Sequence, residues 1–503
     1  MKKTIRNIIL YSATLLMLYV PTGCNSWLDL LPTNDQTTDR YWESKEEVEA
    51  VLASAYKQLR ADACQERYVL WGELRGDGIA LTSATSNAAK IKNLDILTTN
   101  TICQWSAFYT AIGYANSVLK YGPTVLEKDP TFTQELMNSY AAEAIFVRSL
   151  CYFYLVRTFN NVPLVTEPYV DDSQEYAIAS SSEADILARL VSDLENNLSK
   201  CKTGYESDQS NPWQNKGRAT RWAYHALLAD IYLWQGNYDK CIHHCDELEL
   251  SRKFRLMAKE DWFKNFYPGN TDESIFELQW SNSVDNSSSK FYSWYMNGKD
   301  ASPLSTYIIS DKSKELFTET LEKDIRGDNG SYMDVTGKVW KFGGTDYQNI
   351  GGSIRTYQDN NWIFYRYADI RLMKAEALVM KGDLEGAKDI VQDEIRTRAG
   401  YTSQIDLPAT EYDGLMMVMN ERQREFIGEG KRWFDILRVA KRNNFQYKQY
   451  LLDVLLESVS AKDYAVWASK LSDVNSYYLP IYKTEIDNGK GILEQNPYYK
   501  DLD

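Results

Sequence analysis

The sequence predicts a mainly α-helical fold, with tetratricopeptide-like helix pairs as its scaffold and an irregular, loop-rich half that carries a few short strands. Three observations lead to this prediction. Apolar residues recur with the helical period along most of the chain. Two distant segments share the residue spacing of a helix–turn–helix repeat. The stretch between them is rich in Pro, Gly, Ser, Asn and aromatic residues, as expected for irregular structure.

The first 23 residues have the composition of a lipoprotein signal peptide. A basic start precedes an apolar stretch over residues 8–20, which is too short for a comfortable membrane span. Cys24 follows, where a bacterial lipoprotein receives its diacylglycerol thioether, and two or three acyl chains give stable attachment. We predict cleavage before Cys24 and lipidation of its thiol. The alternative is an ordinary signal peptide with an incidental cysteine.

Four helices are predicted in the next part of the chain. The first covers residues 44–59, where Ser44 and Glu47 form a capping box. The others cover residues 105–119, ending at Gly122-Pro123, residues 135–159 and residues 182–198.

Residues 229–241 and 375–387 resemble each other. In each, a small residue lies seven positions before a glycine (Gly236 or Gly382), and another lies five positions after it. Small residues let two helices approach closely, and glycine ends the first helix. The two glycines are too far apart for a tandem array, so we expect scattered repeat units. A scaffold of this kind usually binds a ligand or partner.

The middle of the chain reads differently. Segments with the composition of loops separate short stretches that resemble strands, and we expect strands at residues 274–280 and 339–342. A further short strand is expected near the C-terminus, at residues 478–481. The predicted organisation is a signal peptide (1–23), a helical region with tetratricopeptide-like units (24–252), an irregular aromatic-rich ligand region (253–362) and a C-terminal helical region (363–503).

The charge balance excludes some partners. The chain has 56 Lys+Arg against 70 Asp+Glu, a formal net charge of −14. Nucleic-acid binding needs clustered basic residues, so we expect no nucleic-acid partner. The same charge repels anionic lipid headgroups, which favours a lipid tether over electrostatic attachment.

An ordered set of short motifs runs through the mature chain. They are Cys24-x-x-Trp27-Leu28-Asp29-x-x-Pro32, Tyr41-Trp42, Trp105-x-x-x-Tyr109, Arg148-x-x-x-Tyr152-Phe153, Arg366-Tyr367-Ala368-Asp369, Glu421-Arg422-Gln423-Arg424-Glu425, Gly430-Lys431-Arg432-Trp433 and Leu479-Pro480. Together they resemble the SusD/RagB family of outer-membrane nutrient-binding lipoproteins.

The resemblance implies a concrete role. Such proteins are tethered to the outer leaflet of the outer membrane, facing the cell exterior. They lie as a lid on a SusC-like TonB-dependent barrel transporter, capture oligosaccharides, less often peptides, and pass them inward. The resemblance implies no catalytic activity, and we expect no cofactor or metal. The implied fold is a helical scaffold with an irregular half that carries most ligand contacts.

The strongest local candidate for a glycan site is residues 291–297. Sugar rings pack their C–H faces on Tyr and Trp rings, and Tyr292, Trp294 and Tyr295 are concentrated there beside a polar run. The alternative is a short buried strand. Trp213, Tyr347, Tyr357 and Trp362 are further, weaker candidates.

The resemblance implies a second contact region at residues 68–100, which contains Trp71, Asp77 and Asn87. Asp77 could accept hydrogen bonds from sugar hydroxyls, but it could equally cap the turn between two glycines. Residues 82–92 hold no aromatic side chain, which departs from the stacking tryptophan expected there.

Two other clusters have structural interpretations. One cluster has basic residues at helical spacing with acidic residues between them, which predicts an ion-pair network rather than a basic site; its members are Arg422, Arg424, Glu425, Lys431, Arg432, Asp435 and Arg438. Cys241, His243, His244 and Cys245 invite a metal interpretation, but Cys241 takes the small-residue packing position of the repeat, and we predict no metal.

Two other classes of function stay open. A secreted helical glycoside hydrolase would need two carboxylates facing each other across a cleft, and the 70 Asp+Glu of the chain leave room for such a pair. A scaffold that binds only its barrel partner would show no sugar affinity by itself.

Overall fold

The computed structural model describes residues 41–83, 85–169, 175–205, 213–296, 306–319, 321–346, 354–457 and 459–500. Residues 1–43 and 44–503 are separate compact units, and the fold below is that of the second. The predicted signal peptide and Cys24 lie outside the described residues, as do Asn297 and Tyr347. No helix in the described ranges is long and apolar enough to cross a membrane.

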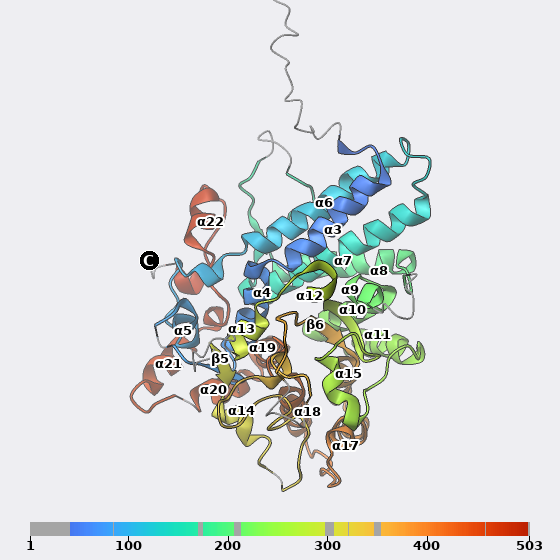
Figure 1. Cartoon of the computed structure of the whole chain (residues 1–503). Helices are drawn as coiled ribbons and strands as arrows, with labels where there is room; N and C mark the ends of the chain where they lie inside the picture. Colours follow the sequence, from blue (N-terminus) through green and yellow to red (C-terminus); the bar gives the residue numbers. More distant parts are fainter. Residues whose placement is uncertain are drawn as a thin grey trace, which may run out of the picture. The chain divides into compact units, whose positions relative to one another are not determined.

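Helices form most of this unit (Figure 1). Their bounds are α3 (Lys45–Leu59), α4 (Asp62–Val69), α5 (Asn87–Lys92), α6 (Ser106–Val125), α7 (Gln134–Phe159), α8 (Glu183–Asn197), α9 (Trp213–Gly217), α10 (Arg221–Gln235), α11 (Tyr238–Leu250), α12 (Asn282–Asp285), α13 (Phe291–Met296), α14 (Asp311–Glu315), α15 (Tyr367–Met380), α16 (Leu384–Asp389), α17 (Thr397–Ala399), α18 (Glu411–Phe426), α19 (Arg432–Phe445), α20 (Lys448–Leu456), α21 (Tyr464–Lys470) and α22 (Lys483–Asn488).

The four N-terminal helices predicted from periodicity are confirmed as α3, α6, α7 and α8. The capping box of Ser44 and Glu47 is present at the start of α3. The predicted end of α6 is wrong, because the helix continues through Gly122 and Pro123 to Val125. Gly122 packs against the Met137 side chain of α7, so the glycine serves a close helix–helix contact rather than a helix end.

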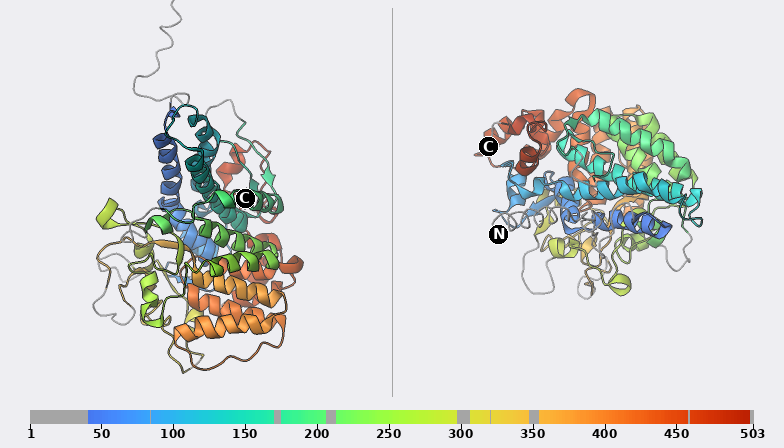
Figure 2. Two further views of the ribbon diagram at one scale, coloured as in Figure 1. Left: turned by 90° about the vertical axis from the view of Figure 1, so that its right-hand side faces the viewer. Right: turned by 90° about the horizontal axis from the view of Figure 1, so that it is seen from above.

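Both predicted repeat units are confirmed as helix pairs. Gly236 separates α10 from α11, and Gly382 separates α15 from α16. Their φ angles of 77° and 82° lie in the left-handed region, which glycine adopts more easily than other residues. Helix α11 packs on α15, although the two units are far apart in sequence. Figure 2 shows these helices stacked in one layer of the molecule. The scattered repeats therefore form a continuous scaffold in space.

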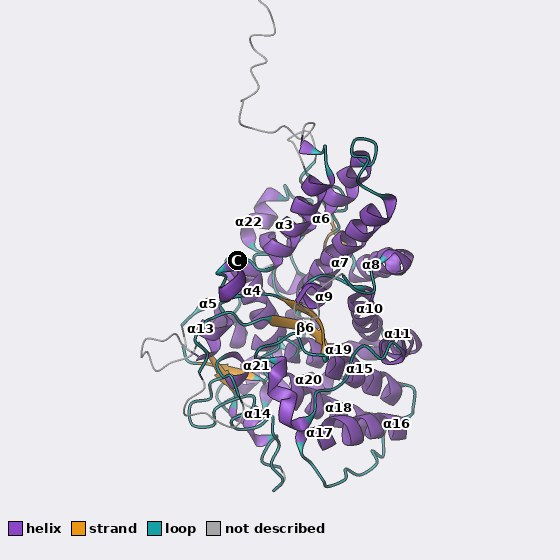
Figure 3. Cartoon of the chain, turned by 45° about the vertical axis from the view of Figure 1, so that its right-hand side comes forward, coloured by secondary structure: helices purple, strands orange, loops and turns teal. Residues whose placement is uncertain are grey.

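The described strands are short and form two-stranded sheets (Figure 3). They form antiparallel pairs: β1 (Ile79–Leu81) with β5 (Tyr307–Ile309), β2 (Val162–Pro163) with β3 (Ser180–Ser181), and β4 (Ser274–Leu278) with β6 (Trp362–Arg366). The strand predicted at 274–280 is confirmed as β4. The strands predicted at 339–342 and 478–481 are wrong: Trp340–Phe342 is a 3₁₀ turn, and 478–481 has no regular structure.

A buried apolar run explains the first of these errors. Val339, Trp340 and Phe342 are buried, and the Phe342 ring stacks on Tyr295 with 4.8 Å between ring centres. Short apolar runs are compatible with a strand or with any other buried segment, so their pattern alone does not identify a strand.

Candidate functional site

Helix α13 carries the aromatic residues predicted to contact a ligand. Tyr292 and Tyr295 are buried, whereas Trp294 is half-buried. The Tyr295 hydroxyl donates to the Gly428 carbonyl at 3.1 Å, which fixes this ring inside the protein. The segment is therefore a short helix with two rings facing the core, and of these three side chains Trp294 offers the most accessible ring.

Trp294 lies where two distant parts of the chain meet. Its ring makes an edge contact with Tyr307 of β5, with 6.4 Å between ring centres. Strand β5 pairs with β1, which lies inside the second predicted contact region and directly follows Asp77 and Gly78. The Ser310 hydroxyl donates to the Asp77 carbonyl, and the Ser310 amide donates to the Gly78 carbonyl at 3.1 Å. The fold thus places both predicted contact regions against β5 and the residue that follows it.

Asp77 itself is an ion-pair residue in this structure. Its carboxylate accepts hydrogen bonds from Arg432 Nε at 2.6 Å and Nη2 at 3.0 Å. Burial alone would raise the pKa of Asp77, but the charge of Arg432 outweighs it, and the pKa lies below its ordinary value. Asp77 is therefore ionised and anchors β1 to the start of α19.

The other two predicted residues of this region differ in accessibility. Trp71 is buried, its Nε1 donates to the Ile102 carbonyl at 3.0 Å, and its ring stacks on Phe108. It belongs to the core and presents no free face. Asn87 is half-buried at the start of α5, and its Nδ2 donates to Thr101 Oγ1 at 3.0 Å. Asn87 thus keeps partial access to solvent.

A large hollow of the described surface lies elsewhere, beside α3. It is an open cleft of about 1140 Å³ between α3, α6, α9 and the end of β4. Trp213 (41% exposed) and Tyr114 (39% exposed) give it accessible aromatic rings. The remaining lining residues are Glu49, Leu52, Ala53, Ser54, Tyr56, Lys57, Gln58, Arg60, Ala61, Gly217, Arg218, Leu278, Gln279, Trp280, Ser287 and Ser288. We call this hollow the α3 cleft.

A hydrogen-bonded group holds part of the cleft wall in place. Arg218 donates to both carboxylate oxygens of Glu143, from Nε at 3.0 Å and from Nη2 at 2.6 Å. The Tyr56 hydroxyl donates to the same carboxylate at 3.0 Å and accepts from the Ala219 amide at 2.9 Å. Burial raises the pKa of Tyr56 well above its ordinary value, so its hydroxyl stays protonated. The wall is therefore preorganised without a ligand.

Sequence reasoning did not find most of this cleft. Of the exposed or buried aromatic residues that line it, the sequence predicts a ligand contact only at Trp213, and Tyr114 and Trp280 are not among the predicted contacts. Tyr114 lies on the exposed side of α6, and an aromatic residue on the polar side of an amphipathic helix was the available signal. Among the other weak candidates, Trp362 is buried and Tyr357 is exposed outside the cleft.

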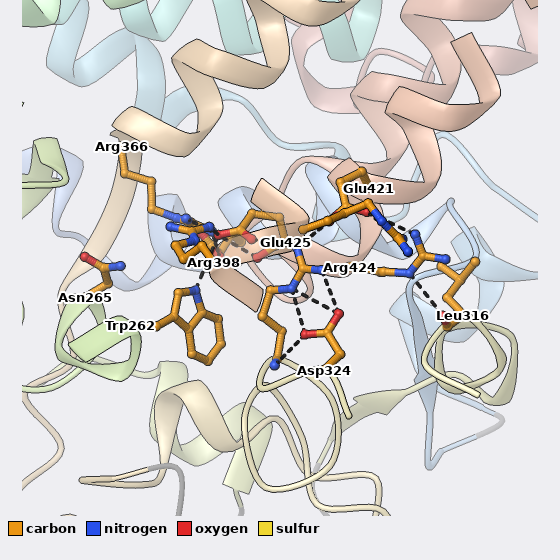
Figure 4. A network of polar contacts seen from close by, with 12 residues as sticks. Trp262, Asn265, Leu316, Asp324, Arg366, Arg398, Glu421, Arg424 and Glu425 are labelled. Atoms are coloured by element: carbon orange, nitrogen blue, oxygen red, sulfur yellow. Dashed lines mark hydrogen bonds and ion pairs between the residues drawn. The ribbon is translucent and has the colours of Figure 1, made fainter. Parts of the chain in front are cut away.

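The predicted ion-pair network is confirmed, because buried Asp435 contacts Arg422 at 2.9 Å and Arg438 at 2.7 Å. Figure 4 shows a further part of it around Glu425. Arg366 contacts Glu273, Glu425 and Glu429 at 2.7, 2.5 and 3.0 Å, and all four side chains are buried. Burial opposes ionisation of Glu425, but Arg398, Arg366 and neighbouring cations outweigh it and lower its pKa well below the ordinary value. These carboxylates are paired with cations inside the core, so they serve the packing of α15 against α18.

The histidines of the first repeat also pair with each other. His225 Nδ1 lies 3.0 Å from His244 Nδ1, and His244 Nε2 lies 3.3 Å from Glu195 Oε1. Burial lowers the pKa of His225 to about 3 and that of His244 to about 4, so both rings are neutral.

The described residues contain no group of three or more side chains suited to hold a metal ion. The described cysteines are free thiols.

Comparison with known proteins gives consistent matches. A model of the SusD family matches residues 199–499, which is more than half of the chain. A second model, described as starch-binding and associating with the outer membrane, matches residues 26–233. A SusD-like protein, P38, of Formosa agariphila is 24% identical over 492 residues, covering 87% of this chain and 92% of the relative.

Solved structures share the fold. A SusD superfamily protein of Bacteroides vulgatus superposes with a TM-score of 0.73 at 22% identity, covering 91% of this chain and 100% of the other. Surface glycan-binding protein A of Bacteroides thetaiotaomicron, solved in complex with laminarihexaose, gives a TM-score of 0.70 at 21% identity, covering 90% of this chain and 99% of the other. At these identities the likeness establishes the fold.

Proposed function

Because the chain belongs to the SusD family, we propose that it is a cell-surface lipoprotein that binds oligosaccharides and delivers them to a SusC-like TonB-dependent transporter. Proteins of this family bind ligands and are not catalysts, and the N-terminal match associates the chain with the outer membrane. The single observation that carries the proposal is this double family match, to the SusD family and to a starch-binding model, which together span residues 26–499.

The structure supports a capture mechanism based on accessible aromatic rings. Trp294 presents part of its indole at the junction of β1 and β5, and a sugar ring can pack its C–H face on such a surface. Asn87 adds an amide in the second predicted contact region, and amides hydrogen-bond sugar hydroxyls in both directions. Affinity should be modest, with Kd roughly micromolar to millimolar, because sugar hydroxyls exchange good hydrogen bonds with water for similar ones with protein.

The predicted lipid on Cys24 would keep the protein at the membrane, next to its transporter. The mature chain is acidic, so attachment relies on the lipid rather than on anionic headgroups. In the proposed mechanism the protein is a lid on the barrel. It captures a glycan while open and hands it over when it closes.

The test uses soluble protein that starts at residue 25. Native gels cast with individual polysaccharides report binding as retardation, and a reducing-end assay on the same mixtures reports cleavage. Retardation by a glycan without new reducing ends is the expected result, and it names the substrate class. New reducing ends would overturn the non-catalytic assignment. Absence of retardation by every glycan would overturn glycan binding and favour peptide cargo.

A further inference from the structure

The α3 cleft has the composition of a carbohydrate site, although its lining does not include Trp294. Ligand pockets typically combine apolar and aromatic walls with a few polar groups and reach about 300–1,000 Å³. At about 1140 Å³ the α3 cleft is slightly larger than this range, and its lining has the same character. Trp213 and Tyr114 supply rings that are about two-fifths exposed, which is unusual for residue types that normally bury most of their surface. Exposed rings in a hollow offer a stacking platform.

The polar lining also suits a chain of sugars. Gln58 and Gln279 provide amides, and Ser54, Ser287 and Ser288 provide hydroxyls. Gln279 is held in position, because its Oε1 accepts from Asn270 at 2.9 Å and from Asn361 at 3.0 Å. Planar amides with fixed orientation discriminate between hydroxyl geometries. The cleft therefore combines stacking surfaces with oriented hydrogen-bonding groups.

The charge of the lining is opposite to that of the whole protein. Lys57 and Arg60 line the cleft, whereas Glu49 is the one acidic residue in its described lining, on a chain with a net charge of −14. Arg218 also lines the cleft, but Glu143 balances its charge. Lys57 is exposed, and its ammonium group makes no hydrogen bond or ion pair within the described residues. A local excess of cations in an acidic protein attracts anionic ligands and repels cationic ones.

We propose that the α3 cleft is a second glycan site, and that it binds oligosaccharides bearing carboxylate or sulfate groups. The inference rests on the proposed glycan-binding function and extends it by a site and a substrate class. Trp213 and Tyr114 stack on sugar rings, and Lys57 and Arg60 pair with the anionic substituents. Arg218 is already committed to Glu143 through two nitrogens, so it serves mainly to hold the wall.

The experiment measures binding by isothermal titration calorimetry on the mature chain from residue 25. The probes are laminarihexaose, hexagalacturonate and a sulfated heparin hexasaccharide, at low and at physiological ionic strength. Three variants are compared with the parent: Trp213→Ala, Lys57→Gln and the control Tyr464→Ala. Tyr464 is 50% exposed on α21, away from the cleft, so the control removes an accessible ring of the same class without touching the site.

We expect at least one acidic hexasaccharide to bind more tightly than laminarihexaose, with an affinity that falls as the ionic strength rises. Trp213→Ala should weaken that binding about fivefold to tenfold, and Lys57→Gln should weaken it about threefold and flatten the salt dependence. Tyr464→Ala should bind like the parent. All variants should unfold at the parent temperature, because the changed side chains are exposed.

Two results would overturn the proposal. One is that neither acidic probe binds better than laminarihexaose. The other is unchanged affinity in both cleft variants. If laminarihexaose binds equally well to the parent and to both cleft variants, and neither acidic probe binds better, the second site fails while the proposed function stands. If no probe is bound and no polysaccharide retards the protein, both fail.

Discussion

The guanidinium carbon of Arg60 lies 5.3 Å from the centre of the Trp280 ring, at the edge of the α3 cleft. Trp280 is itself buried, so the ring acts as a flat support that holds the cation at the cleft surface. Arginine stacks well on aromatic faces because its charge is delocalised over a plane and weakly hydrated. The contact joins the end of α3 to the end of β4 and fixes one cation of the proposed site.

Replacement of Arg60 by Met distinguishes the role of its charge in ligand binding from the role of its side chain in packing on Trp280. Arg60→Met retains an unbranched side chain that can cover Trp280, but it loses the cation. We expect binding of an acidic hexasaccharide to weaken about threefold to fivefold, with binding of laminarihexaose unchanged. Calorimetry with the two probes checks this. Arg60→Lys is the matched control, because it keeps the charge and should retain most of the affinity. An equal loss for both probes would assign Arg60 a structural role only.

Trp294→Ala tests the first proposed site. The side chain is half-buried and packs edge-on against Phe291 and Tyr307, with 5.9 and 6.4 Å between ring centres. Its removal should weaken glycan binding about tenfold or less while leaving the protein folded. Affinity gels report the binding, and circular dichroism reports the fold. Unchanged affinity in a folded variant would remove Trp294 from the site.

Trp71→Ala should affect stability instead. The indole is buried, stacked on Phe108 with 4.9 Å between ring centres and hydrogen-bonded to the Ile102 carbonyl. Truncation leaves a large cavity, and the free energy of unfolding should fall by about 3–5 kcal/mol. Urea denaturation measures this loss. Should the variant keep its stability but lose glycan affinity, Trp71 would be a ligand contact and its assignment to the core would be incorrect.

The contrast between Trp71 and Trp294 shows what the sequence could and could not predict. Helices with a clear apolar period, such as α3 and α8, were predictable because one face must be buried. The repeat turns at Gly236 and Gly382 were predictable because left-handed backbone favours glycine. Whether a tryptophan faces the core or solvent depends on neighbours that are distant in sequence, such as Ile102 for Trp71. The α3 cleft was missed for the same reason, since four separate elements build it.

Acid should destabilise the protein through its buried ion pairs. Burial opposes ionisation of Asp369 and Glu376, but the cations beside them prevail and lower both pKa values to about 2. Lys431 and Arg422 contact Asp369, and Arg438 contacts Glu376. Because the folded pKa lies below the unfolded value of 3.8 or 4.5, these pairs stabilise the fold above about pH 4.5.

That stability is lost as the pH falls from 4.5 towards 2. Thermal unfolding across this range should therefore show a steep decrease in Tm. Glu376→Gln should have a lower Tm at neutral pH, because Arg438 and Arg442 lose a buried counter-charge. Its Tm should also depend less on pH between 4.5 and 2. If the parent and the variant lose stability in parallel over this range, Glu376 is not a source of the acid sensitivity.

Glu73 should have the opposite pH dependence. It is buried in the π-helical turn Leu70–Leu74, and burial raises its pKa from 4.5 to about 8. One carboxyl oxygen accepts from the Gly430 amide at 3.0 Å, and the other has no hydrogen-bond partner. The folded protein thus binds the Glu73 proton more tightly than the unfolded chain does. This contribution is fully present below pH 4.5 and is lost progressively as the pH rises towards 8.

Glu73→Gln removes this titration while keeping the shape and the acceptor for Gly430. The variant should therefore gain stability relative to the parent as the pH rises from 4.5 to 8. Denaturant unfolding at pH 5, 6.5 and 8 measures the difference. Asp77→Asn is the matched control, because Asp77 contacts Arg432 at 2.6 Å and its substitution should destabilise at all three pH values. A stability difference between Glu73→Gln and the parent that does not change with pH would show that Glu73 is already ionised in the folded protein.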